Sequence, residues 1–312
     1  PGLALLYSSK EEDFRVYASI EEGRMRLYFA VKHEGVWKVA EGVYGEKKID
    51  LRRAECDVIE TTRGAMVKAL ERLGLTAEVD QPTEHRDEKG KVKGYRLFLY
   101  GPHITPLLER AAEYVRAEPA EVRLEGRRIV VKAGGVEAEV EFKLLKGKEA
   151  MYLLAKDVKQ TLALYKSLRE VGVRVEITPK GVKVDSEAMW ALVAATVERG
   201  APSALPAVVM PGVELLKVHS AGGVKMYIFR AEGDQYYFAV KTEKEWRAAG
   251  GKLSGGKVRI FGEAVHTVAE ALNAIYSEMG MDRRVEVKHV KDGTPYIRLT
   301  NEALKLLGIR SQ

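Results

Sequence analysis

The two ends of the chain repeat one another, and this self-similarity constrains the fold more than any other feature of the sequence. Residues 1–6 read PGLALL, and residues 211–216 read PGVELL. The pentapeptide YFAVK occurs at 28–32 and again at 237–241, and a tryptophan follows each occurrence at the same distance. Self-similarity of this kind is the signature of a repeat protein. Each end is therefore predicted to fold as a copy of one unit.

The second half of the repeat occurs three times. Three segments end a helical pattern on glycine: LERLGL at 70–75, LREVGV at 168–173 and YSEMGM at 276–281. Glycine readily adopts the left-handed conformation that stops a helix, so each segment predicts a helix C-terminus. Alternating apolar residues follow each one and predict a hairpin with one buried face, before a further helix. The expected fold is α+β, with tandem ββ-α-ββ-α units and antiparallel sheets.

Two extra strands are predicted at the start of each outer copy, and a shorter copy lies between them. We place copy one at 1–117, the middle copy at 118–200 and copy three at 213–312, with an Ala- and Pro-rich linker at 201–212. The expected opening strands are Leu3–Tyr7, Phe14–Ile20, Met25–Lys32 and Trp37–Val43 in copy one, and Val122–Glu125, Arg128–Lys132 and Val136–Leu144 in the middle copy. The expected last helices are Pro106–Val115, Glu187–Val197 and Glu302–Leu307.

The charge of the chain is compatible with an acidic partner. The net charge is +6 and the pI about 9.1, and Lys and Arg bind nucleic acid by displacing counterions from its phosphates. Only two Asn and four Gln occur beside abundant Lys, Arg and Glu, which is the composition expected of a protein from a hot habitat. No apolar run approaches the roughly 20 residues of a membrane span, so we expect no membrane partner and a cytoplasmic location. Because the chain opens on Pro1, we expect a fragment or processed form of a longer protein.

No motif predicts a catalytic residue. The six histidines form no H-E-x-x-H spacing, and neither a G-x-x-x-x-G-K-[ST] phosphate loop nor a G-x-S-x-G elbow occurs. Cys56 is the only cysteine, which excludes a disulfide within the chain and a cysteine zinc site. We therefore expect no catalytic residue and no cofactor.

Basic residues gather on the strands around the two repeated tryptophans. Arginine and lysine bind phosphates, and aromatic rings on a sheet stack on bases, so these strands predict a nucleic-acid-binding surface. The alternative is that the aromatic residues form the core while Lys and Arg lie on the solvated face; these aromatic residues are Tyr28, Phe29, Tyr237, Phe238 and the two tryptophans, Trp37 and Trp246. The predicted nucleic-acid-binding residues are Arg24, Arg26, Lys32, Lys38, Lys241, Arg247, Lys252, Lys257 and Arg259.

The order of strands and helices resembles the LAGLIDADG homing endonucleases. YRLFLYGPHITPLLERA at 95–111 is similar to the final strand and helix of that family. The resemblance implies DNA binding and, in the nucleases, paired acidic residues at the ends of two helices that hold divalent metal ions. The nearest stretch here, LVAATVERG at 192–200, has Glu198, but Arg199 stands before the glycine where the acid belongs. Glu198 is therefore the one candidate metal ligand, with Mg²⁺ as the metal if the protein is a nuclease.

A second resemblance covers residues 151–310. The segments at 175–200, 225–241 and 296–310 are similar to the paralogous-repeat proteins of hyperthermophilic Thermoproteales archaea, a family that is largely uncharacterised. Three hypotheses follow. The first is a non-catalytic nucleic-acid-binding protein made of degenerate LAGLIDADG-like repeats, with duplex DNA as the favoured partner. The second is a divalent-metal DNA endonuclease, and the third is a protein-interaction or structural repeat module. The oligomeric state is left open.

Overall fold

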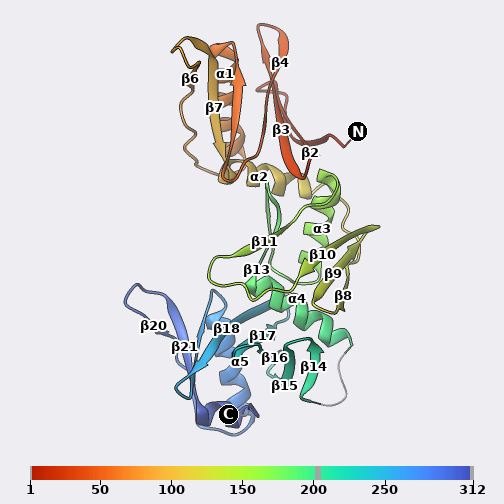
Figure 1. Ribbon diagram of the computed structural model, residues 1–312, viewed down its shortest axis with the longest axis vertical. Coiled ribbons are helices and arrows are strands. Elements are labelled where there is room, and N and C mark those ends of the chain that lie inside the picture. The colour runs from red at the N-terminus through yellow and green to blue at the C-terminus, as the bar shows by residue number, and fades with distance from the viewer. Residues whose placement is uncertain (1, 201–204, 310–312) are drawn as a thin grey trace. The chain divides into compact units, whose positions relative to one another are not determined.

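The computed structural model describes residues 2–200 and 205–309, which Figure 1 shows as helices and strands. Of these residues, 43% lie in strands and 25% in helices, so sheets dominate the architecture. The chain divides into two compact units. The first holds Pro1–Glu118, Tyr152–Ser167 and Glu176–Lys183, and the second holds Pro119–Met151, Leu168–Val175 and Val184–Gln312. Copy one thus lies in the first unit and copy three in the second, while the middle copy contributes residues to both.

Copy one folds into two antiparallel sheets that share a helix. Helix α1 (Cys56–Arg72) packs against strands of both sheets and buries Ile59, Met66 and Leu70. Helix α2 (Gly101–Ala112) follows the last strand. The first sheet has the order β1-β2-β3-β4, with β1 Ala4–Ser9, β2 Phe14–Glu21, β3 Arg24–His33 and β4 Val36–Val43. The second has the order β5-β7-β6, with β5 Lys48–Arg53, β6 Thr83–Arg86 and β7 Val92–Tyr100.

Copy three, together with the strand Ala207–Met210 that precedes it, forms one eight-stranded antiparallel sheet with a helix on each face. Helix α5 (Val265–Glu278) packs on one face over fully buried residues such as Ile228, Phe238 and Val258. Helix α4 (Ser186–Arg199) packs on β17 and β18 from the other face, and α6 (Asn301–Leu306) ends the described chain. The strand order is β14-β15-β16-β17-β18-β19-β21-β20, with β14 Ala207–Met210, β15 Val213–Ala221, β16 Val224–Ala231, β17 Gln235–Lys241, β18 Trp246–Ser254, β19 Lys257–Phe261, β20 Lys288–His289 and β21 Pro295–Thr300.

The middle copy supplies two small antiparallel sheets and helix α3 (Val158–Glu170). One sheet has the order β10-β9-β8, with β8 Glu121–Glu125, β9 Arg128–Ala133 and β10 Val136–Glu141. The other has the order β11-β13-β12, with β11 Ala150–Leu153, β12 Glu176–Thr178 and β13 Gly181–Asp185.

One strand order occurs three times. β5-β7-β6, β11-β13-β12 and β19-β21-β20 each place the last strand of a hairpin between the other two, and a helix leads from the first strand to that hairpin in every case. The glycines predicted to stop the three helices, Gly74, Gly172 and Gly280, have φ of 78°, 92° and 71°, which confirms the left-handed helix stop.

Copies one and three have a glycine at the same position for the same steric reason. Gly42 and Gly251 lie on β4 and β18, where the next strand crosses closely. A Cβ at Gly42 would lie 2.9 Å from the carbonyl oxygen of Asp50, and one at Gly251 would overlap the carbonyl oxygen of Arg259. Only glycine lets these strand pairs approach so closely.

The predicted tandem ββ-α-ββ-α units in a LAGLIDADG-like fold are wrong. Within the described residues, the structure has five antiparallel sheets, the largest with eight strands, and six helices. Each outer copy has five strands before its first helix, because β5 and β19 are strands that the alternation pattern left out. In copy three these strands also join one continuous sheet, since β19 pairs with both β18 and β21.

The predicted copy boundaries stay predictions. Of the predicted linker at 201–212, residues 201–204 lie outside the described part of the chain, and Ala207–Met210 forms β14, which pairs with β15. In the described part, no helix is both long and apolar enough to cross a bilayer.

Candidate nucleic-acid interface

Of the residues predicted in copy one, Arg24, Arg26 and Lys32 alternate along β3 and share one face of its sheet, whereas Lys38 on β4 stands opposite the buried Val31. Arg26 binds Glu21 at 2.9 Å and Glu41 at 3.6 Å, and Lys38 lies 3.4 Å from Glu55. Lys32 is exposed and makes no ion pair with another described residue. The carboxylates thus compete with any phosphate for Arg26 and Lys38.

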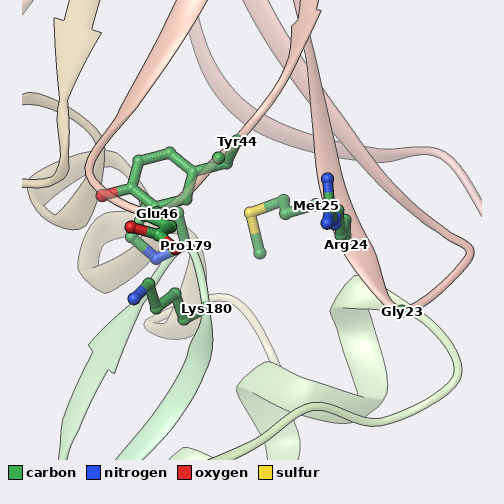
Figure 2. A pocket seen from close by; sticks show the side chains of 8 residues that line it. Gly23, Arg24, Met25, Tyr44, Glu46, Pro179 and Lys180 are labelled. Carbon is green, nitrogen blue, oxygen red and sulfur yellow. The ribbon is translucent and has the colours of Figure 1, made fainter.

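Arg24 lines an open hollow of about 360 Å³ at the end of β3. Figure 2 shows Met25 extending toward Tyr44, with Glu46 and Lys180 beside the tyrosine and Arg24 set apart from them. Burial raises the pKa of the Tyr44 hydroxyl, and the nearby Tyr152 adds to the effect. Arg24 also lines a second open hollow of about 500 Å³, together with Arg26, Glu21 and Glu22, so the structure brings these two predicted residues together beside two acids.

In copy three, two of the predicted residues serve the packing of helix α4. Arg247 is 8% exposed and pairs with Glu187 in the first turn of α4. Burial raises the pKa of the Glu187 carboxyl, and the hydrogen bond and charge of Arg247 oppose that rise. Lys241 donates to Glu198 at 2.8 Å. Both cations are therefore neutralised within the fold.

Glu198 is an ion-pair acceptor in this structure. Its carboxylate lies 2.8 Å from Lys241 and 3.7 Å from Lys225, two cations rather than a second acid. No group of three or more His, Cys, Asp and Glu side chains in the described residues is arranged to hold a metal ion. The two lysines thus account for the Glu198 carboxylate as an ion-pair acceptor, and its role as a metal ligand stays a prediction.

The remaining predicted residues, Lys252, Lys257 and Arg259, lie on an open face that we call the copy-three face. Helix α5 covers the other side of these strands, where Val258 and Ile260 are fully buried. The copy-three face consists of the outward side chains Lys252, Lys257, Arg259, Phe261, Lys288, Tyr296 and Arg298.

Aromatic rings and cations alternate on the copy-three face. Phe261 stands directly opposite Tyr296, and their rings stack with centroids 5.6 Å apart and an interplanar angle of 26°. The guanidinium of Arg259 lies 5.9 Å from the Tyr296 ring centroid. Phe261 is 41% exposed, which is high for a large apolar side chain. The rings are therefore accessible to a flat ligand, with cations beside them.

The cations of this face lack carboxylate partners among the described residues. Arg259 stands directly opposite Arg298 on the neighbouring strand, and neither forms an ion pair with a described carboxylate. Like charges directly opposite one another destabilise a sheet. A bound anion would relieve this repulsion. Beside Arg298, a hollow of about 220 Å³ is lined by Arg283, Arg284 and Lys288, with Glu286 as its acid.

Copy one repeats the arrangement on the outward side of β5 and β7, which we call the copy-one face. The Nζ of Lys48 lies 3.9 Å, and the guanidinium of Arg96 4.9 Å, from the ring centroid of Phe98. Asp50 is the one acid on these two strands, and it binds Arg52 at 2.7 Å. Both outer copies thus present an aromatic ring flanked by cations at the same place in the strand order.

Sequence reasoning missed the aromatic residues of both faces. Phe98, Phe261 and Tyr296 alternate with buried residues such as Leu97, Ile260 and Ile297. Only Phe261 lies on a strand that the alternation pattern left out, β19. Phe98 and Tyr296 lie on β7 and β21, in hairpins that the pattern predicted, where every second residue shares one face.

The chain was also compared with known proteins. No protein-family model, no curated protein and no solved structure matches it, so the resemblance to the Thermoproteales repeat family stays a prediction.

Proposed function

We propose that the protein binds nucleic acid through the copy-one and copy-three faces. The observation that carries the proposal is the opposed pair Arg259 and Arg298, which has no described carboxylate partner. The pair lies beside the stacked rings of Phe261, which is exposed, and Tyr296, which is half-buried. Arginine binds phosphate, and an open ring face stacks on a base. The same combination recurs around Phe98 in copy one.

The exposed rings favour single strands over duplex DNA. In a duplex, the faces of the bases are occupied by their stacked neighbours, and only base edges and phosphates are open. A sheet with exposed aromatic rings instead suits unpaired bases, as sheet-based RNA-binding modules show in general. The proposal places the protein in the cytoplasm, where single-stranded RNA is abundant.

A salt titration tests the proposal. Binding of a labelled single strand of about 15 nucleotides, a matching duplex and an RNA of the same sequence is measured by fluorescence anisotropy. We expect log Kd to rise linearly with log salt, because cations on the protein displace counterions. For the variant Arg259→Ala/Arg298→Ala we expect weaker binding and a slope lower by about 1.4 on single strands, roughly 0.7 per lost phosphate contact.

A second variant separates stacking from charge. Phe261→Ala/Tyr296→Ala should weaken single-strand binding by about 1–3 kcal/mol per lost base stack, with the salt slope unchanged. The matched control, Lys156→Ala/Lys159→Ala, removes the same number of charges at two exposed lysines that belong to neither face and should leave the affinity within about twofold. Wild-type protein that fails to bind all three nucleic acids at low salt, or an equal loss in the control, refutes the proposal.

A further inference from the structure

The outer face of the β1–β4 sheet is uncovered, whereas its counterpart in copy three is packed under helix α4. In copy three, Trp246 is 3% and Ala248 3% exposed. The equivalent residues in copy one are Trp37 and Val39, and each is 40% exposed. The open face continues through Leu5, which is 51% exposed.

The two faces match in register as well as in sequence. Lys32 stands directly opposite Trp37, and Lys241 stands directly opposite Trp246. Tyr28 precedes Lys32 by four residues, as Tyr237 precedes Lys241, so each tyrosine shares a face with its lysine.

Helix α4 contacts the tyrosine and the lysine of this pattern in copy three. Trp190 stacks on Tyr237 with ring centroids 4.0 Å apart, and Glu198 accepts a hydrogen bond from Lys241. The two helix residues are eight positions apart, about 12 Å along a helix. The two strand residues are four positions apart, about 13 Å along a strand. The spacings therefore match, and copy one offers the same spacing between Tyr28 and Lys32.

The charge of the open face also suits a helix that resembles α4. Lys32 forms no ion pair with a described residue, and the Arg15 guanidinium lies over the exposed Trp37 ring at 4.9 Å. In copy three, the corresponding lysine is neutralised by the Glu198 carboxylate. The open face thus lacks both the aromatic residue and the acid that α4 supplies to its counterpart.

We infer that the outer face of β1–β4 binds a helix of the α4 type, with an aromatic residue and, eight positions later, a carboxylate. The aromatic residue stacks on Tyr28 and covers Val39, and the carboxylate binds Lys32 and Arg15. Glu41 occupies the position that Gly250 has in copy three, and its carboxylate pairs with Arg26. The helix is therefore expected to place a small or basic residue over Glu41.

A fusion protein tests the inference on the full chain. Residues 185–200, with Asp185 as the N-cap of α4, are added ahead of the chain through about 15 Gly and Ser residues, which span roughly 20 Å. The readout is the rate at which a maleimide labels Val39→Cys in a Cys56→Ser background. A short flexible linker gives a millimolar effective concentration, so we expect labelling at least about fivefold slower than in the same variant without the fusion.

Controls separate docking from a general effect. Val208→Cys, at a position that is 75% exposed on β14, should be labelled at the same rate with and without the added helix. Changing Glu198 to Lys in the added helix alone should restore most of the labelling, and Lys32→Glu in the chain should then slow it again. An unchanged Val39→Cys rate in the original fusion overturns the inference. So does a concentration-dependent dimer of the unfused chain that protects Val39→Cys, because the face would then bind a second copy.

Discussion

At the scale of single residues, close backbone approach decides which positions tolerate no side chain. Gly251 is the extreme case, because a Cβ there would overlap the Arg259 carbonyl oxygen of the neighbouring strand. Gly42 is the milder copy of the same position, with 2.9 Å to the Asp50 oxygen. In both cases the neighbouring atoms belong to the backbone of the next strand, so neither site relaxes through a rotamer change.

Alanine substitutions at the two glycines should differ in the stability that they remove. We expect Gly251→Ala to lower the free energy of unfolding by about 3 kcal/mol or more, and Gly42→Ala by less. Gly64→Ala in helix α1 is the control, because nothing lies within 4 Å of the new Cβ. Alanine there should stabilise the helix by about 0.5–1 kcal/mol. Urea unfolding curves measure all three, and equal losses at Gly251 and Gly64 contradict the steric argument.

At the scale of elements, the buried pair of Glu187 and Arg247 fixes helix α4 to β18. Their side chains are 15% and 9% exposed, so removing one partner leaves the other charge buried without a counterion. Such a loss costs far more than breaking an exposed pair. Arg174 and Glu245 form an exposed pair at 2.8 Å in the same compact unit, with 55% and 30% exposure.

Arg247→Met should destabilise the protein in a pH-dependent way. At pH 7 we expect a loss of about 3–5 kcal/mol, against less than about 1 kcal/mol for Arg174→Met. Burial already raises the pKa of Glu187, and without Arg247 nothing described opposes that rise as strongly. A raised folded-state pKa means that the folded protein binds a proton more readily, so the loss should shrink as pH falls toward the ordinary carboxyl range. Urea midpoints at pH 7 and 4.5 measure this, and a loss that grows on acidification contradicts it.

The sequence predicted most strands and all three helix stops, but not how the strands assemble. Alternation identified β2 and β3 because buried residues recur at every second position of both strands. It missed β5 and β19, which have only six and five residues and carry charges at several positions. The basic residues were predicted from residue type alone, and that signal does not distinguish Arg247, buried beside Glu187, from Arg259, open on the copy-three face.

At the scale of the whole molecule, each compact unit has a core of its own. Phe29 is fully buried in the first unit, and Phe238 is fully buried in the second. Units with separate cores unfold separately unless a large interface couples them. The middle copy supplies residues to both units, so neither unit corresponds to one run of the chain.

Calorimetry should resolve two transitions. We expect Phe29→Ala to lower the midpoint of one and Phe238→Ala the midpoint of the other, each through a loss of about 3–5 kcal/mol from a core cavity. Circular dichroism at low temperature checks that both variants are folded before heating. A single transition that both substitutions shift equally would show that the units unfold together.

The shared register of the β3–β4 and β17–β18 hairpins has a consequence for how the chain reaches its native state. Both hairpins contain the same pentapeptide and the same Lys–Trp pairing, so each is a plausible partner for the other's neighbouring strand during folding. The turns that precede them differ: two residues, 22–23, join β2 to β3, whereas three residues, 232–234, join β16 to β17. Unequal turn lengths penalise an exchanged pairing, so the divergence of these turns protects a duplicated chain from swapping its own halves.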